Sequence, residues 1–246
     1  MLGAAAAKAG PALLFDPHNG KILYQEDMDA LWHPASLTKL MTAYLVLEAV
    51  VSGDASLDDA VSVSEKAWRA TGSRMFIEVN STVPLDDLLR GLIVQSGNDA
   101  AIALAEHVAG SEEAFIDAMN AKAAELGMTG TTYRNANGLP ARGHVSTARD
   151  TALLARALID HFPEHYSRYS EREFTYNEIT QHNRNALLWL DDSVDGLKTG
   201  YTRAAGYCLA SSAIRDGMRL IAIVFGSSTP DARTEGSLEL LNYGFN

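Results

Sequence analysis

The stretch HPASLTKLMTAYLVLEAV, residues 33–50, joins a run of apolar residues to a serine and a lysine at its beginning. The apolar residues predict a buried helix that starts just after Pro34, a residue favoured at helix starts, and stops at Gly53. Ser36 and Lys39 are three positions apart, so on a helix their side chains share one face and can hydrogen-bond. A core helix that opens with this pair is a candidate for chemistry as well as packing.

The chemistry that suits this pair is nucleophilic catalysis. A serine hydroxyl is a poor nucleophile unless a base removes its proton, and a lysine can be that base if burial or a second cation lowers its pKa. The positive amino end of the helix would stabilise the negative charge that develops during acyl transfer. Alone, the Ser-x-x-Lys spacing is weak evidence, because it arises often by chance and a helix cap beside a surface lysine also explains it.

The composition is that of an ordinary globular chain: 246 residues, 47% hydrophobic, with a net charge of −11. Such a chain can bury one large core or two small ones. Acids and bases are mixed and no basic stripe occurs, which argues against nucleic acid as a partner. The single Cys208 excludes an internal disulfide and a cysteine-based zinc or iron–sulfur site.

The sequence also bears on membranes and export. No run of about eighteen consecutive apolar residues occurs, so we expect no membrane span. The opening MLGAAAAKAG lacks the basic start and the apolar run of a secretion signal, and we interpret it as a mature or trimmed amino end.

Strands are expected at both ends of the chain, with helices between them. Turn residues divide residues 12–15 from 21–25, and RDG divides GYCLASSAI from RLIAIVFG, so each pair predicts a hairpin; a last helix covers roughly residues 231–243. Apolar residues recur at helical spacing from about residue 54 to 160. We therefore expect an α/β (α+β) fold, in which residues 1–53 and 190–246 form one subdomain around an antiparallel sheet. Residues 54–189 would be a mainly helical insertion, with the active site in the cleft between the two parts.

Two further short motifs raise the significance of the first. SGN stands at residues 96–98, in a loop between two helical runs, and KTG at residues 198–200, before the β-rich end. Ser-x-x-Lys, the SGN-type motif and Lys-Thr-Gly, in this order, correspond to the signature of penicillin-binding proteins and class A β-lactamases. The stretches DPHNGKILYQED, QSGNDAAIALAEHVAGS, NANGL, TARDTALLARAL and VDGLKTGYTRAAGYCLASSA extend the similarity over nearly the whole chain. The chain resembles the low-molecular-mass penicillin-binding proteins, serine-type D-alanyl-D-alanine carboxypeptidases of the bacterial cell wall, and the resemblance implies their transpeptidase-like fold.

The resemblance implies roles for the motif residues. Ser36 would attack the carbonyl of a terminal D-Ala-D-Ala bond and Lys39 would take its proton. Ser96 would pass a proton to the leaving amine, and Asn98 would hold the substrate amide and orient Lys39. The oxyanion hole would be the backbone N–H groups of Ser36 and Tyr201.

A second set would hold the substrate's carboxylate. Lys198 would attract that carboxylate and disfavour the charged form of Lys39, Thr199 would offer it a hydroxyl, and Gly200 would leave room for the peptide backbone. Arg233 would bind the carboxylate with its planar guanidinium; the alternative for Arg233 is a surface salt bridge on its helix.

The family's partners follow from the same resemblance. We expect a peptidoglycan stem peptide ending in D-Ala-D-Ala as substrate, β-lactam antibiotics as covalent inhibitors, and neither a metal nor another cofactor. Because this substrate is part of the cell wall, the resemblance implies a periplasmic or extracellular location.

Three alternatives stay open. A class A β-lactamase needs a glutamate that activates the deacylating water, but residues 126–149 contain no Asp or Glu, so we expect a long-lived penicillin adduct. HFPEH at residues 161–165 matches an inverted zinc motif, but Pro163 would break the helix that the motif requires. The third alternative is a penicillin-sensing or wall-binding module that has lost hydrolysis.

Overall fold

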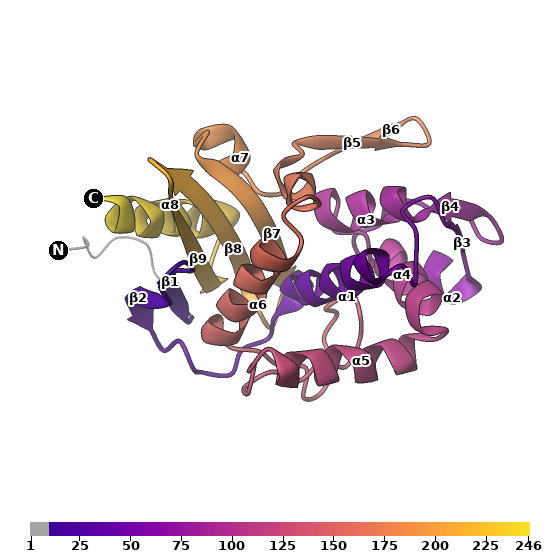
Figure 1. Cartoon of the computed structure of the whole chain (residues 1–246), viewed down its shortest axis with the longest axis horizontal. Coiled ribbons are helices and arrows are strands. Elements are labelled where there is room, and N and C mark those ends of the chain that lie inside the picture. Colours follow the sequence, from indigo (N-terminus) through magenta and orange to yellow (C-terminus); the bar gives the residue numbers. More distant parts are fainter. Residues whose placement is uncertain (1–9) are drawn as a thin grey trace.

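The fold is built on a five-stranded antiparallel sheet formed from both ends of the chain (Figure 1). The computed structural model describes residues 10–246, so nearly all of the opening segment interpreted as a trimmed amino end lies outside the described residues. The strand order is β2-β1-β9-β8-β7, which leaves β7 at one edge. The strands are β1 (Ala12–Asp16), β2 (Lys21–Glu26), β7 (Val194–Thr202), β8 (Gly206–Arg215) and β9 (Met218–Ser227). The predicted sheet and both hairpins are confirmed.

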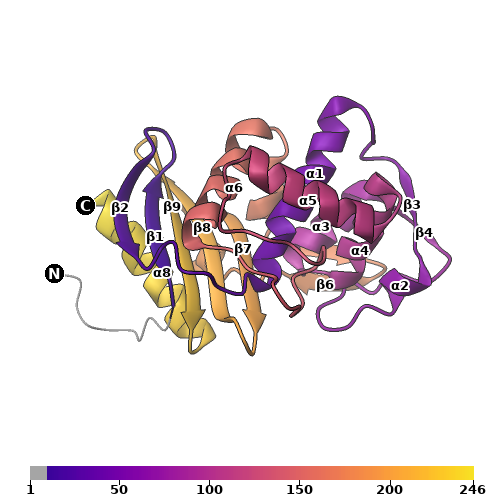
Figure 2. The same cartoon turned by 90° about the horizontal axis from the view of Figure 1, so that it is seen from below.

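Both faces of the sheet are buried, and each is covered by a different helix. Side chains alternate along a strand, so Leu220 and Ala222 of β9 enter the core under α8 (Pro230–Phe245), while Ile221 and Ile223 enter the larger core on the other face. Helix α6 (Ala148–His161) packs on β9 and β1 from that second face (Figure 2). The sheet is therefore the middle layer of three.

The helical part lies beyond the β7 edge. Its first helix is α1 (Thr38–Ser52), preceded by the short 3-10 helix η1 (Ala35–Leu37) and ended, as predicted, by Gly53 in the left-handed region. The other helices are α2 (Glu65–Trp68), α3 (Leu85–Val94), α4 (Asn98–Ala109) and α5 (Glu112–Glu125). Ser111 caps α5 and Thr147 caps α6, each by accepting a backbone N–H, which explains why these helices begin there.

Two small hairpins were not expected from the sequence. β3 (Ala60–Ser62) pairs with β4 (Thr82–Pro84), and β5 (Glu173–Tyr176) pairs with β6 (Ile179–His182). The 3-10 helix η2 (Tyr166–Ser170) and the one-turn helix α7 (Leu187–Leu190) complete the described chain. The boundaries proposed at residues 53 and 190 stay a prediction; α6, inside the proposed insertion, packs on the sheet.

Helix α1 together with η1 forms a long apolar stretch. By length and composition alone, Ala35–Ser52 could cross a membrane, although the sequence led us to expect no span. In the fold, 72% of this stretch is buried against the rest of the protein, as in the core helix of a globular domain.

The zinc-like motif is split by the end of a helix. α6 ends at His161, as Pro163 predicts, and the two histidines bond to different partners: His161 to the hydroxyl of Tyr44 at 2.7 Å, and His165 to the guanidinium of Arg168 at 3.1 Å. Among residues 10–246, no group of three or more His, Cys, Asp or Glu side chains could hold a metal ion.

Candidate active site

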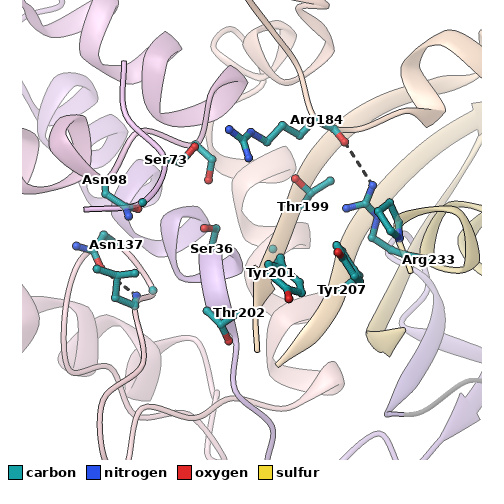
Figure 3. A pocket seen from close by; sticks show the side chains of 16 residues that line it. Ser36, Ser73, Asn98, Asn137, Arg184, Thr199, Tyr201, Thr202, Tyr207 and Arg233 are labelled. Carbon is teal, nitrogen blue, oxygen red and sulfur yellow. Dashed lines mark hydrogen bonds between the residues drawn. The ribbon is translucent and has the colours of Figure 1, made fainter. Parts of the chain in front are cut away.

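The three sequence motifs meet in one cavity of about 460 Å³ between η1, the α3–α4 loop and strand β7 (Figure 3). Residues that line it from these segments and from the start of α4 include Ser36, Ser96, Asn98, Thr199, Gly200 and Tyr201. Arg233 reaches the cavity from α8, and Asn137 and Gly138 reach it from the loop before α6. The structure thus brings together segments that are up to about two hundred positions apart in the sequence.

Lys39 is fully buried beneath Ser36 and makes three polar contacts. Its Nζ lies 3.1 Å from Ser36 Oγ and 2.7 Å from Asn98 Oδ1, and it donates a short hydrogen bond to the main-chain carbonyl of Asn137. The two carbonyl oxygens can only accept hydrogen bonds, so a neutral Lys39 amine donates its two N–H groups to them. Its lone pair is then left for the Ser36 hydroxyl, which is the arrangement that a general base requires.

The surroundings of Lys39 favour that neutral form. Burial is the main cause that brings the pKa of Lys39 well below its usual range, and the positive charges of Lys198 and, to a smaller degree, Arg184 add to it. The carboxylate of Asp99 acts in the opposite direction. Burial, with Arg184 and Arg233 nearby, also lowers the pKa of Lys198 to about 7.

The second motif is held in a strained turn. Ser96 has a φ of +66°, a region that non-glycine residues seldom adopt. Its Oγ is buried and has no hydrogen-bond partner among the described residues. A buried hydroxyl without a hydrogen-bond partner costs free energy. The Ser96 hydroxyl is therefore available to form a hydrogen bond with a molecule that enters the cavity. Asn98 is fixed from both sides, because its Nδ2 donates to the carbonyl of Thr71 at 2.6 Å while its Oδ1 accepts from Lys39.

The third motif lies inside strand β7, at the edge of the sheet. Lys198 is buried, and its Nζ is 3.4 Å from the carbonyl of Thr199. Gly200 is needed where the strand meets the nucleophile, since a Cβ there would lie 3.1 Å from Ser36 N and 3.2 Å from the Ala35 side chain. Gly200 was predicted to leave room for the peptide substrate. In the structure it also leaves room for the protein's own backbone at Ser36.

Among residues 10–246, Arg233 has no partner for the surface salt bridge that was its alternative. It is only 7% exposed, lines the cavity, and donates from Nη2 to the main-chain carbonyl of Arg184 at 3.5 Å (Figure 3). Its Nε has no partner among the described residues. No Asp or Glu is among the described residues that line the cavity, so Arg184 and Arg233 give it a positive end suited to a carboxylate.

Sequence reasoning missed four residues that build this site. Asn137 supplies the carbonyl for Lys39, and Gly138, with φ +85°, lets its loop pack on the carbonyl of Ala35. Arg184 and Ser73 line the opposite rim. The signal for the first two was NANGL, a turn-like stretch that the sequence places at the floor of the cleft without a role for either residue. Nothing in the local sequence distinguishes Arg184 or Ser73.

Comparisons with known proteins agree with this geometry. A family model described as D-alanyl-D-alanine carboxypeptidase matches residues 2–229. The chain is 48% identical to D-alanyl-D-alanine carboxypeptidase DacC of Escherichia coli K12, over 95% of this chain and 60% of that protein. It therefore spans less than two thirds of this curated relative.

Solved structures give the same result. Penicillin-binding protein 5 from Haemophilus influenzae is 42% identical, with a TM-score of 0.93, over 96% of this chain and 70% of that one. Penicillin-binding protein D2 from Listeria monocytogenes, in its ampicillin-bound form, is 35% identical, with a TM-score of 0.88, over 96% and 97% of the two chains.

Proposed function

The chain belongs to the D-alanyl-D-alanine carboxypeptidase family, and from this premise we propose that it removes the terminal D-alanine from peptidoglycan stem peptides through an acyl-enzyme on Ser36. The observation that supports this most directly is the contact set of Lys39: one serine hydroxyl and two carbonyl acceptors around a buried amine.

Acylation starts when Lys39 takes the Ser36 proton and Ser36 Oγ attacks the carbonyl of the penultimate D-alanine. The negative charge on the carbonyl oxygen is stabilised by the backbone N–H groups of Ser36 and Tyr201, which the close packing of Gly200 on Ser36 brings near each other. Ser96, whose hydroxyl has no other partner among the described residues, passes a proton to the leaving amine of D-alanine.

Recognition of the substrate rests on its terminal carboxylate. Lys198 and Arg233 attract this charge and the Thr199 hydroxyl donates to it, which selects a peptide end over an internal bond. Asn98 holds the amide before the scissile bond with the same side chain that accepts from Lys39.

β-Lactam antibiotics acylate Ser36 by the same first step. In class A β-lactamases a glutamate activates the water that releases the drug. No carboxylate lines the described part of this cavity, so release is slow and the protein is a target of the drug rather than its destroyer. A penicillin-sensing module without hydrolysis has less support, because Ser36, Lys39 and Ser96 are all present.

The proposed substrate places the protein at the cell wall. We propose that it acts outside the cytoplasmic membrane, in the periplasm or beyond the cell. The helical insertion and the sheet subdomain proposed from the sequence would form the two walls of the substrate cleft.

The test has two parts. After treatment with penicillin, mass spectrometry of a digest should find the adduct on Ser36, and Ser36→Ala should abolish it, whereas Ser170→Ala, at an exposed serine of η2, should not. A soluble acyl-D-Ala-D-Ala peptide should release free D-alanine. An adduct on any other residue, or turnover of penicillin within seconds, contradicts the proposal; labelling without release of D-alanine supports the sensing module instead.

A further inference from the structure

A buried carboxylate outside the catalytic cavity takes no direct part in the proposed mechanism. Glu112 is the first residue of α5, is 7% exposed, and is not among the described residues that line the cavity. Its Oε1 accepts a hydrogen bond from the backbone N–H of Ala136 at 3.1 Å, and its Oε2 pairs with Lys66 Nζ at 2.8 Å. Because a buried charge is costly unless it is paired, these two contacts define what Glu112 does: it ties one backbone position to the start of α5.

The backbone position that Glu112 holds lies next to a partner of the proposed base. Ala136 is fully buried, so its N–H has no access to solvent, and its carbonyl accepts from Thr42 Oγ1 of α1 at 2.6 Å. The next residue, Asn137, lines the cavity (Figure 3), and its carbonyl accepts from Lys39 Nζ. A shift of Ala136 would therefore move the carbonyl that orients Lys39.

The other bonds of this loop do not fix it at the same point. Asn120, two turns further along α5, accepts from Tyr133 N at 2.8 Å and donates to Tyr133 O at 3.1 Å. The side chain of Asn135 closes the turn within the loop itself. These bonds hold the start of the loop and give it its shape. The bond from Ala136 to Glu112 is the one that joins α5 to the residue directly before Asn137.

The charge of Glu112 is balanced from the surface. Lys66 of α2 is 47% exposed and pairs with Glu113 at 3.2 Å as well as with Glu112. The hydrogen bond to Glu112 is the main cause that raises the pKa of Lys66 above its usual range, and Glu113 adds to it. Lys66 therefore stays charged and compensates the buried carboxylate. Glu113, whose side chain is 77% exposed, shares this cation and makes a matched control for Glu112.

We propose that Glu112 is a positioning residue for the general base. Through Ala136 it keeps the Asn137 carbonyl in place to accept from Lys39, and it keeps the loop closed over that amine. The inference rests on the proposed function and deepens it. With the carbonyl in place, the lone pair of the neutral amine stays directed at the Ser36 hydroxyl. With the loop released, the amine can turn away and water can reach it.

The test measures the acylation of Ser36 by a fluorescent penicillin over a range of drug concentrations and pH values. Glu112→Leu fills a similar volume but offers no acceptor to the Ala136 N–H. We expect its limiting rate of acylation to fall by at least about tenfold, with the half-saturating drug concentration within about threefold of that of the intact protein. Since burial is the main cause that lowers the pKa of Lys39, opening the loop raises that pKa and shifts the acid limb of the rate profile to higher pH.

Two control variants separate positioning from charge. Glu112→Gln keeps an oxygen that can accept from Ala136 N and gives up only the negative charge, so it should restore the limiting rate to within about threefold of the intact protein. Glu113→Ala removes the exposed partner of Lys66 and should leave the rate within about twofold, because a solvent-exposed ion pair contributes little.

A second route to the same backbone position covers the case in which Glu112→Leu does not fold. Thr42→Val releases Ala136 from the α1 side at nearly unchanged volume and should give the same fall in rate and the same shift of the acid limb. A normal limiting rate in either variant, even with a lower Tm, shows a merely structural role and overturns the inference while the proposed function stands. A loss in Glu112→Leu that Glu112→Gln does not restore, or a change in the half-saturating concentration alone, also overturns it. If the intact protein is not labelled at Ser36, the proposed function itself fails.

Discussion

Replacing Asp99 by asparagine tests how the catalytic loop is held. The Asp99 side chain is 1% exposed, and its carboxylate accepts from Met75 N at 3.0 Å, Phe76 N at 2.9 Å, Ala100 N at 2.9 Å and Ile77 N at 3.4 Å. These bonds fix the segment next to the cavity wall. In Asp99→Asn one carboxylate oxygen becomes an NH2 group. At that position a backbone N–H then faces another donor and loses its hydrogen bond.

The size of the effect follows from the bonds lost. A hydrogen bond to a charged group contributes about 1.5–3 kcal/mol, so losing the bonds of Phe76 and the longer one of Ile77 costs about 3 kcal/mol of the free energy of unfolding. For a chain of this size that lowers Tm by about 10 °C. Because the Asp99 charge raises the pKa of Lys39, its removal lowers that pKa further, and the acid limb of the pH–rate profile for acylation shifts to lower pH.

Thermal unfolding and the rate of labelling by a fluorescent penicillin, measured from acid to neutral pH, give the two readouts. Asp117→Asn, at an exposed position of α5, is the matched control and should change neither. An unchanged Tm together with an acid limb that stays in place or shifts to higher pH in Asp99→Asn would refute both the loop anchor and the electrostatic argument.

Three further predictions concern the cavity directly. Gly138 has a φ of +85°, and a Cβ there would lie 1.9 Å from Ala35 O. Gly138→Ala should therefore displace Ser36 and slow penicillin labelling by about a hundredfold, while the far-UV circular dichroism stays unchanged. Labelling at the normal rate would contradict this. Lys198 has a pKa of about 7 in the free protein, so it is charged below that pH and neutral above it, and kcat/KM for peptides with a free carboxylate should fall as pH rises through about 7. Lys198→Arg should move this limb to higher pH, and a limb that does not move would contradict the assignment. Arg233→Gln should raise KM for the peptide by about tenfold with a smaller change in kcat, and an effect on kcat alone would exclude Arg233 as a carboxylate ligand.

The sequence predicted the elements whose signals are local. The turn Asp216–Gly217 has positive φ at both residues, the conformation that RDG indicated, and Ser111 caps its helix as its type suggests. The β3–β4 pair could not be predicted in this way, because its strands have three residues each and are about twenty positions apart. The β5–β6 turn places Glu178 at φ +65°, where glutamate is unusual, so its turn signal was weak.

In the site, too, residues marked by a local motif were predictable, and residues placed there only by the fold were not. Ser36, Lys39 and Lys198 were predicted from motifs, since the chemistry needs those side chains at those spacings. The carbonyl of Asn137 could not be predicted, because every residue has a carbonyl and only the fold selects which one meets Lys39. Arg184 is one of many arginines, and its place on the cavity rim depends on the path of a loop.

The proposed general base, Lys39, is held by distant parts of the chain. Lys39 Nζ is bonded to residues 59 and 98 positions further along, and the cavity closes only when β7 packs on η1. A fragment that contains Ser36 and Lys39 alone therefore holds an ordinary protonated lysine and an inert alcohol. If β-lactams acylate Ser36 as proposed, their covalent attachment will report what fraction of a refolding population has reached its native structure.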